Sequence, residues 1–433
     1  MKNLRRVGIV GGARLPFARI NTNYLHKSNF DMFVATLKGI ADRFGLLAEP
    51  LGEVAAGAVV KHTRDSNLTR DAVIAAGLNP QTPGYDVQQA CATSLETAIL
   101  VGNKIATGQI DIGIAGGVDS ASDTPVVVDE SLREIILGLQ RARSRAERIN
   151  SIARFRLRML KLEMPNINDR FTGLSRGEHC EQMVKRWNIS RAAQDELALS
   201  SHRLANDAYD CGFYADLLIP FAGLERDNNL RRDTSLEKLA ALRPAFDRSS
   251  GEGTITAGNS TPLTDGAAAI VLASEQWATQ RRTNLQAYLV DAETAAVNYI
   301  GPDAEGLLMA PAHAVPRLLA RNELTLQDFD FYEIHEAFSG QVLCTLAAWA
   351  DEKYCREILK LPGPLGAIDR SRLNVNGGSV GLGHPFAATG ARILASAAKQ
   401  LSQHRAQTGR PARTLVSVCA AGGLGVTAIL QSD

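Results

Sequence analysis

Four side chains in this sequence have the types and local settings that nucleophilic and acid–base chemistry requires: Cys91, His335, His384 and Cys419. Cys91 follows a predicted strand and opens a predicted helix, so its sulfur is expected near the positive end of a helix dipole. That setting lowers the pKa of a thiol and makes a nucleophilic thiolate available near neutral pH. A small buried hydrophobic residue is the alternative interpretation of this position.

His384 lies in a glycine-rich turn, GLGHPFAATG, in which Pro385 suits the first turn of the helix that follows. A histidine at a strand–helix junction projects into the crevice where α/β sheets hold their ligands. The imidazole is therefore a candidate general base for a thiol. The alternative is a histidine that only makes a hydrogen bond within the turn.

The other two candidates stand at the ends of predicted strands. Cys419 precedes the turn AAGGLG, whose backbone N–H groups can point at an anion. This position could combine an acid–base thiol with an oxyanion hole, or hold a buried cysteine before a loop. His335 and Glu336 are polar where an apolar strand predicts burial. They indicate either an active site or a hydrogen-bonded network in the core.

Alternating strands and amphipathic helices must position these residues. Short strands are predicted at 7–10, 110–114 and 415–418, and helices at 95–106 and 387–401. This alternation indicates an α/β fold whose sheets are covered on both faces. The order strand, reactive residue, helix, strand and glycine pair occurs twice, so we expect two similar halves that join near residue 275.

Composition excludes several classes of protein. The chain has 47 Lys plus Arg against 46 Asp plus Glu, a net charge of +1, which argues against a general nucleic-acid binder. Six cysteines without a CxxC pair predict neither a disulfide framework nor a metal site. No apolar run approaches the roughly 20 residues of a membrane-spanning helix, and residues 7–10 are too short for a signal peptide. We therefore expect a cytoplasmic protein.

Four motifs together resemble the thiolase family. They are QACATSLETA around Cys91, HEAF at His335, GHPFAATG at His384 and CAAGGLG at Cys419, in the family's order and separations. Residues 257–269, AGNSTPLTDGAAA, resemble the family's coenzyme A loop. Many thiolases have NEAF. The HEAF form is similar to the long-chain branch, which includes the β subunits of bacterial and mitochondrial trifunctional fatty-acid oxidation complexes.

The resemblance implies a five-layer α-β-α-β-α sandwich of two similar halves, residues 1–275 and 276–433, with a loop domain inserted at about 121–250. It implies an acyltransferase of fatty-acid β-oxidation that cleaves 3-ketoacyl-CoA with free coenzyme A, or runs the reverse Claisen condensation. Coenzyme A would be a substrate, and no cofactor or metal would be needed. The implied partners are a second copy, as a homodimer or tetramer, and a hydratase/dehydrogenase subunit.

The resemblance also implies a role for each reactive residue. Cys91 would attack the 3-keto carbon and become an acyl thioester, His384 would activate its thiol, and Cys419 would handle the proton on the α-carbon of acetyl-CoA. His384 and His335 would hold the thioester enolate, His335 directly or through a water molecule. Backbone N–H groups of Cys91 and Ala421 would hold the tetrahedral oxyanion.

Further thioester contacts are implied at four positions. Thr261, with Ser260 beside it, matches the hydroxyl that contacts pantetheine, and Phe338 would line the passage of the thioester. Arg176 stands where the family commonly has Met, beside the acyl and pantetheine pocket. We therefore expect an altered chain-length or acyl-group preference.

Other functions fit parts of this pattern. An acetoacetyl-CoA-specific biosynthetic thiolase would differ only in substrate range. A ketosynthase-like condensing enzyme would use Cys91, His335 and His384 but would lack a counterpart of Cys419. A non-catalytic subunit that binds coenzyme A or lipid would have no use for two cysteines that face one crevice.

Residues 131–170 differ from the rest of the chain. They hold ten basic and four acidic side chains, a net charge of +6, while the remainder, with 37 basic and 42 acidic side chains, carries −5. Apolar residues recur in this segment at helical spacing. It is either a solvated helical insertion or a basic amphipathic surface for a membrane or for an anionic ligand such as coenzyme A.

Overall fold

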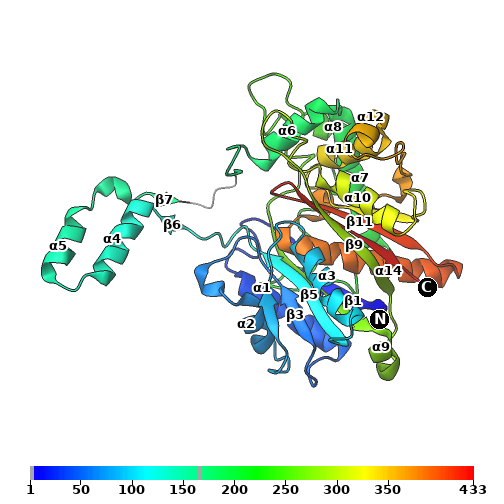
Figure 1. Ribbon diagram of the computed structural model, residues 1–433, viewed down its shortest axis with the longest axis horizontal. Helices are drawn as coiled ribbons and strands as arrows, with labels where there is room; N and C mark the ends of the chain where they lie inside the picture. Colours follow the sequence, from blue (N-terminus) through cyan, green and yellow to red (C-terminus); the bar gives the residue numbers. More distant parts are fainter. Residues whose placement is uncertain (1–3, 164–167) are drawn as a thin grey trace.

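The computed structural model describes residues 4–163 and 168–433 (Figure 1). Its main sheet, as far as these residues show it, has the strand order β10-β11-β12-β9-β1-β8-β5-β3-β4, with β2 paired to β8. The strands of the first half are β1 (Val7–Arg14), β2 (Ala18–Arg19), β3 (Glu53–Ala56), β4 (Gly84–Asp86), β5 (Ile112–Asp119) and β8 (Thr264–Ser274). Those of the second half are β9 (Ala287–Ala296), β10 (Phe331–Ile334), β11 (Arg413–Ala420) and β12 (Leu424–Gln431).

The same strand order occurs in both halves. In the first half the order is β1-β8-β5-β3, and in the second half it is β9-β12-β11-β10. In each series the first two pairs of neighbouring strands are antiparallel and the third pair is parallel. β4 lies parallel to β3, and Leu373 makes a parallel bridge to Tyr332 of β10 at the equivalent place. β1 also pairs with β9, so the two half-sheets are continuous. The division at residue 275 stays a prediction.

Helices form three layers around the two half-sheets. The central pair, α3 (Thr93–Ala106) and α14 (Thr389–Thr408), contacts strands of both halves, and every residue of 389–401 is buried. α1 (Asn29–Phe44) and α2 (Leu68–Ala75) cover the outer face of the first half-sheet. α10 (Ala310–Arg321) and α11 (Ser339–Ala350) cover that of the second. This arrangement confirms the predicted α/β five-layer sandwich.

The predicted elements lie in place with shifted bounds. The strands predicted at 7–10, 110–114 and 415–418 are parts of β1, β5 and β11, although β5 begins only at Ile112. The helix predicted at 387–401 begins as a 3-10 turn, η4 (Phe386–Ala388), before α14 continues to Thr408. The first turn of α14 packs closely against α3, because a Cβ on Gly390 would lie 2.4 Å from the backbone N of Leu95.

The chain between β5 and β8 leaves the sandwich. Its elements are β6 (Val127–Val128), α4 (Glu130–Arg141), α5 (Arg145–Ala153), η2 (Leu157–Met159), β7 (Leu162–Glu163), α6 (Arg176–Arg186), α7 (Arg191–Asp210) and α8 (Leu236–Ala240). α6 packs on α11, and α7 packs on α13 (Ser379–Leu382), so both helices cover the second half. The remaining short helices are η1 (Thr63–Asp65), α9 (Glu275–Arg281), α12 (Glu352–Glu357) and η3 (Arg370–Arg372).

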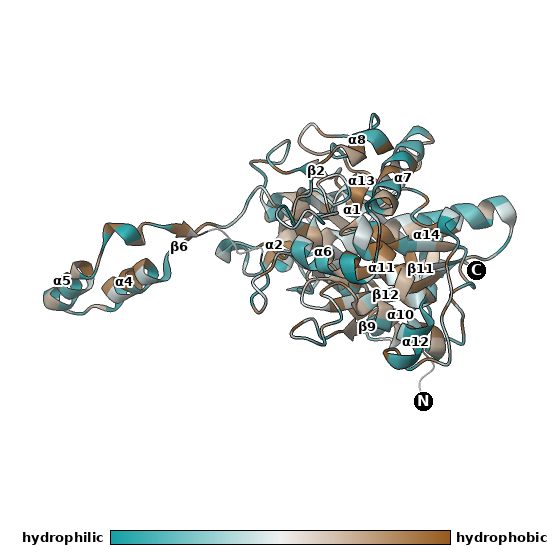
Figure 2. Ribbon diagram, turned by 90° about the horizontal axis from the view of Figure 1, so that it is seen from above, coloured by the Kyte–Doolittle hydropathy of each residue, from teal (hydrophilic) through white to brown (hydrophobic). Residues whose placement is uncertain are grey.

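The helices α4 and α5 form a hairpin that projects from the body on the β6–β7 ribbon (Figures 1 and 2). Ile135 is the buried residue of α4, and α5 has none. The apolar stripe predicted for 131–170 faces outward only in part: Ile149 and Ile152 of α5 are exposed at 65% and 58% of their surface, whereas its α4 residues Leu132 and Leu139 are half-buried beside the buried Ile135. Ile136, which lies outside that stripe, is exposed at 42%. Residues 164–167 of that segment lie outside the described part. No described helix has the length and apolar character needed to cross a membrane.

Candidate active site

Cys91 and His384 meet at the junction of the two halves. Cys91 lies two residues before α3, and Ala90 before it has a left-handed φ of 47°, which costs a non-glycine residue about 1 kcal/mol. His384 follows Gly383, whose φ is 109° and where a Cβ would lie 2.7 Å from Asn229 Nδ2. These two turns bring Cys91 Sγ to 3.1 Å from His384 Nε2, so the predicted pair is in contact.

The protonation of this pair differs from the sequence prediction. Burial raises the pKa of Cys91 to about 11, and it outweighs the opposing effects of Arg176 and of backbone hydrogen bonds from Ala421 and Cys91 itself. The predicted lowering of this pKa by the helix dipole is therefore wrong, because desolvation of the thiolate is the larger effect. Burial, with Arg392 and Arg176, lowers the pKa of His384 to about 3. The resting pair is a neutral thiol beside a neutral imidazole, which suits a general base.

His335 stands directly after β10 and faces His384. The two ring centroids are 4.1 Å apart, and one ligand atom from each of Cys91, His335 and His384 lies within 4.8 Å of the others. Burial, then His384 and then Arg392, lowers the pKa of His335 well below its usual value, so this ring is also neutral. Its Nδ1 lies 2.8 Å from Ser379 Oγ, and its buried Nε2 has no partner among the described residues.

Cys419 and Ala421 approach the same sulfur from the second half. Cys419 is buried near the end of β11, and burial followed by the nearby Cys91 raises its pKa well above the usual value. Ala421 begins the turn to β12, in which Gly422 and Gly423 have φ of 90° and 70°. The backbone N–H groups of Ala421 and of Cys91 itself act on the Cys91 sulfur in the direction that lowers its pKa. These are the two donors that the sequence predicted for an oxyanion.

The predicted coenzyme A loop, residues 257–269, is hydrogen-bonded to the segment that follows His335. Ser260 pairs with Phe338 in an isolated bridge and donates its hydroxyl to Thr256 O at 2.6 Å. Thr261 donates to Ala337 O at 3.2 Å, which leaves its hydroxyl oxygen able to accept a hydrogen bond. Phe338 packs edge-on against Phe246, with centroids 5.9 Å apart.

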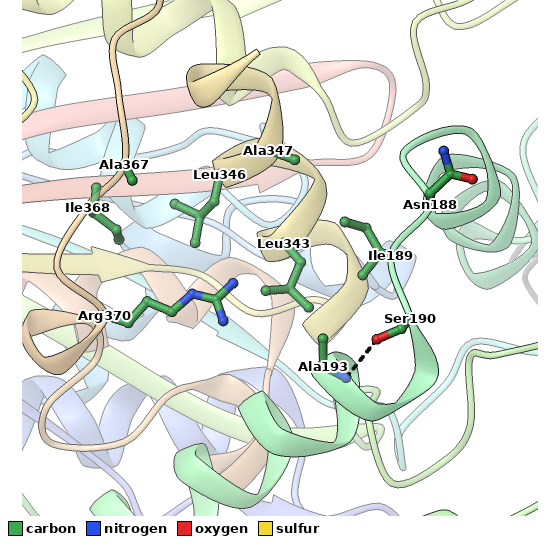
Figure 3. Close-up of a pocket in the computed structure, with 10 residues that line it drawn as sticks. All are labelled: Asn188, Ile189, Ser190, Ala193, Leu343, Leu346, Ala347, Ala367, Ile368 and Arg370. Atoms are coloured by element: carbon green, nitrogen blue, oxygen red, sulfur yellow. Dashed lines mark hydrogen bonds between the residues drawn. The ribbon is translucent and has the colours of Figure 1, made fainter.

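A separate cavity of about 360 Å³ lies between the α6–α7 turn, α11 and residues 367–370 (Figure 3). Leu343 and Leu346 of α11 point into it, and Arg370 reaches toward them. None of the predicted site residues lines it. The reactive cluster, and not this cavity, is the candidate active site.

Comparisons with known proteins agree with this geometry. A model of the thiolase N-terminal domain matches residues 7–276, and one of the thiolase C-terminal domain matches residues 288–432. The chain belongs to the thiolase family. It is 39% identical over 434 aligned positions to proteins named 3-ketoacyl-CoA thiolase from Shewanella sp. (strain W3-18-1) and Shewanella putrefaciens, covering 99% of this chain and 97% of each relative.

Solved thiolase structures share the fold of the whole chain. The Bacillus anthracis acetyl-CoA acetyltransferase has a TM-score of 0.82 at 28% identity, with all of both chains covered. The Acat5 thiolase from Ascaris suum, solved in complex with coenzyme A, has a TM-score of 0.80 at 26% identity and covers 99% of this chain and 100% of its own.

This thiolase holds its reactive residues with side chains that the sequence did not single out. Thr389 Oγ1 lies 2.6 Å from His384 Nδ1 and stands within the quoted GHPFAATG motif, so the motif could have indicated it. Glu336, which the sequence already marked as polar beside His335, lies in a hydrogen-bonded network of the core: it accepts from Ser201 Oγ, Asn374 Nδ2 and Val380 N at 2.7, 2.7 and 3.0 Å. No local signal marked these distant partners.

Arg176 is the remaining predicted residue of the thiolase site. It is the first residue of α6, is exposed, and interacts electrostatically with Cys91 and His384. A cation therefore stands near the reactive cluster where the family commonly has an uncharged side chain.

Proposed function

We propose that this thiolase cleaves 3-ketoacyl-CoA with free coenzyme A, giving acetyl-CoA and an acyl-CoA shortened by two carbons, or runs the reverse condensation. The contact between Cys91 Sγ and the neutral His384 Nε2, 3.1 Å apart, is the observation that carries this proposal. The names of the relatives at 39% identity support the substrate class.

The first half-reaction begins when His384 Nε2 takes the proton of Cys91 and the sulfur attacks the 3-keto carbon. The backbone N–H groups of Cys91 and Ala421 stabilise the tetrahedral oxyanion, a contribution of about 3 kcal/mol for each donor. The C2–C3 bond then breaks, the thioester enolate is held by His335 and His384, and its carbon takes a proton from Cys419. Acetyl-CoA leaves.

In the second half-reaction, the Cys419 thiolate takes the proton of an incoming coenzyme A thiol. The coenzyme A sulfur attacks the Cys91 thioester, the shortened acyl-CoA leaves, and His384 returns its proton to Cys91. Protons and electrons balance without a cofactor or metal, and coenzyme A enters only as a substrate.

Cleavage by purified protein tests this function. The protein is mixed with coenzyme A and either acetoacetyl-CoA or 3-ketohexadecanoyl-CoA, and loss of the 3-keto enolate absorbance is followed. Cys91→Ala is expected to abolish cleavage, while Cys211→Ala, at an exposed cysteine outside the site, keeps it. Absence of cleavage at every chain length contradicts the function, and activity of Cys91→Ala contradicts the nucleophile.

We further propose that Arg176 changes the acyl-group preference, because a cation near the thioester disfavours an apolar contact there. A ladder of 3-ketoacyl-CoA lengths is assayed with wild type and Arg176→Met. The profiles are expected to differ in kcat/KM, and identical profiles contradict the proposal. Activity confined to acetoacetyl-CoA would instead identify the biosynthetic type of thiolase.

We propose a cytoplasmic homodimer or tetramer that can join a hydratase/dehydrogenase subunit, as the HEAF resemblance implies. Copurification with such a subunit from the source organism tests the second partner. A chain recovered without it under conditions that preserve fatty-acid oxidation contradicts that part of the proposal.

We also propose that the α4–α5 hairpin makes peripheral contact with an anionic membrane surface. The support is the exposure of Ile136, Ile149 and Ile152 together with the +6 charge of residues 131–170. Apolar side chains enter the headgroup boundary, and basic side chains are attracted to anionic lipids.

Cosedimentation with vesicles tests this contact. We expect binding to vesicles that contain phosphatidylglycerol, weaker binding in high salt, and loss of binding in the triple variant Ile136→Ser, Ile149→Ser, Ile152→Ser. Leu25→Ser, at an exposed apolar residue of the body, is the matched control. Equal binding by the triple variant contradicts the proposal.

A further inference from the structure

A chain of buried polar groups leads away from the active site through His335. His335 Nδ1 lies 2.8 Å from Ser379 Oγ, and Arg392 donates an Nη2 hydrogen bond to the same oxygen at 2.7 Å. Arg392 is 2% exposed on α14, and Ser379, at the start of α13, is fully buried. These are the two hydrogen bonds of Ser379 Oγ among the described residues.

The direction of these hydrogen bonds follows from donor accounting. A guanidinium can only donate, so Ser379 Oγ accepts from Arg392. The one hydroxyl proton of Ser379 then has a partner only if it is donated to His335 Nδ1. If Nδ1 donated instead, that hydroxyl proton would be buried without an acceptor, which is costly. His335 Nδ1 is therefore an acceptor.

The proton of His335 must then lie on the other ring nitrogen. The ring is neutral, because burial and the nearby charge of Arg392 disfavour an imidazolium. A neutral imidazole carries one proton, and with Nδ1 accepting, this proton is on Nε2. That N–H is buried and unpartnered within the described structure, and it belongs to the Cys91–His335–His384 cluster.

His384 requires the opposite tautomer. Its Nε2 faces the Cys91 thiol and must accept a proton to act as a base, so Nδ1 donates to Thr389 Oγ1 at 2.6 Å. Two imidazoles whose centroids are 4.1 Å apart thus carry their protons on different nitrogens. For His335 the side chains behind the ring decide which nitrogen this is, whereas for His384 the contact with the Cys91 thiol and the role as a base do, and the Thr389 hydroxyl can accept the remaining proton.

We propose that Ser379 and Arg392 are positioning residues that hold His335 in its Nε2–H tautomer, as a direct hydrogen-bond donor to the thioester enolate oxygen. This inference rests on the site assignment given under the proposed function. It makes His335 a neutral donor whose direction is set before the substrate arrives, which is what stabilises a charge that develops only during the reaction.

Two reactions of the same enzyme separate this role from a structural one. Exchange of the acetyl group between acetyl-CoA and labelled coenzyme A needs Cys91 and the backbone oxyanion hole but forms no enolate. Cleavage of the carbon–carbon bond in acetoacetyl-CoA forms the enolate. A defect in the His335 donor therefore slows cleavage and spares exchange.

The test variant is Ser379→Ala, and the control is Ser396→Ala, at another buried serine one turn after Arg392 on α14. We expect Ser379→Ala to lower kcat for cleavage between about 10-fold and about 100-fold, below the loss on removing an oxyanion donor outright. Exchange is expected to stay within about twofold, and Ser396→Ala is expected to match wild type in both reactions. Any other division of the Ser379→Ala defect between the two reactions overturns the proposal.

A spectroscopic measurement reads the tautomer without a serine variant. Protonated and unprotonated imidazole nitrogens differ in ¹⁵N chemical shift, and His335→Asn identifies the His335 signals by their loss. A protonated Nε2 with an unprotonated Nδ1 in the wild type supports the proposal, and the reverse overturns it. Wild-type cleavage, measured first, shows separately whether the proposed function itself holds.

Discussion

At the scale of the residue, burial decides the protonation of the active-site pair. Cys91 has the helix-side position that favours a thiolate, yet its pKa is raised to about 11 because partial burial of the residue desolvates the thiolate. His384, buried beside it, has its pKa lowered to about 3. The proposed mechanism therefore starts from a protonated thiol, which would need His384 as a base to become a nucleophile.

This neutral pair predicts the pH dependence of Cys91 alkylation in the free enzyme. Below its raised pKa the thiol is protonated, so the rate with iodoacetamide is expected to rise about tenfold per pH unit from pH 6 to 9. His384 is already neutral throughout that range. The rate is measured by mass spectrometry of the separate peptides, with the exposed Cys211 as an internal reference. A rate that stays flat between pH 6 and 8 would show a thiolate–imidazolium pair.

At the scale of the element, close backbone packing holds the catalytic turns. Gly390 lets α14 approach α3, and a Cβ on Gly117 of β5 would lie 2.1 Å from Ala387 O, in the turn after His384. Asp119 at the end of β5 accepts from Ala387 N at 2.8 Å, so the strand also holds that turn by a hydrogen bond. Small residues at these contacts bring the turn that carries His384 against the first half.

Gly390→Ala tests this packing. The new methyl would meet the backbone of Leu95 at 2.4 Å, so α14 must move, at an expected cost of about 1–3 kcal/mol. Gly102→Ala in α3, where the nearest atom is a side-chain carbon at 3.3 Å, is the control and is expected to be near neutral. Melting temperatures and cleavage rates are compared. Equal melting temperatures for the two variants would contradict the packing argument.

We expect the projecting α4–α5 hairpin to contribute neither to the stability nor to the activity of the rest of the molecule. Asp129 N donates to Lys161 O at 3.1 Å, so a short Gly–Ser linker can replace residues 130–160 without stretching the ends. Because α4 and α5 bury almost nothing, we expect the melting temperature and the cleavage rate of the body to stay unchanged. A clear loss of either quantity would show that the hairpin contributes to the fold or to the site.

At the scale of the whole molecule, the two halves, which share one strand order, both contribute residues to the candidate active site. Cys91 comes from the first half, while His335, His384 and Cys419 come from the second. The net charge of +1 is also divided, between the +6 segment at 131–170, much of which lies in the hairpin, and the −5 remainder. The reacting end and the projecting basic hairpin are thus separate parts of the molecule.

The proposed oligomer is tested at this scale. Multi-angle light scattering at micromolar concentration is expected to give the mass of a dimer or tetramer. The variant with residues 130–160 replaced is expected to form an oligomer with the same number of subunits, at a correspondingly lower mass, since the hairpin projects away from the body. A monomeric wild type would contradict the proposed oligomer, and a monomeric variant would assign the interface to the hairpin.

The sequence by itself was enough to name the candidate reactive residues and to predict the alternation of strands and helices and the two similar halves. Each is a local property: motifs such as GHPFAATG and CAAGGLG are contiguous, and hydrophobic periodicity is read within one element. The repeated order of strand, reactive residue, helix and glycine pair likewise needed no contact between distant segments.

Only the tertiary structure decided the environment of those residues. Cys91 and His384 meet across 293 positions, and Ser379 and Arg392 reach His335 from other elements. Desolvation depends on everything packed around a group, so the raised pKa of Cys91 and the neutral rings beside it follow from burial and not from local pattern. The exposure of Ile136 on α4 and of Ile149 and Ile152 on α5 was decided in the same way, because it depends on which segments pack against the hairpin.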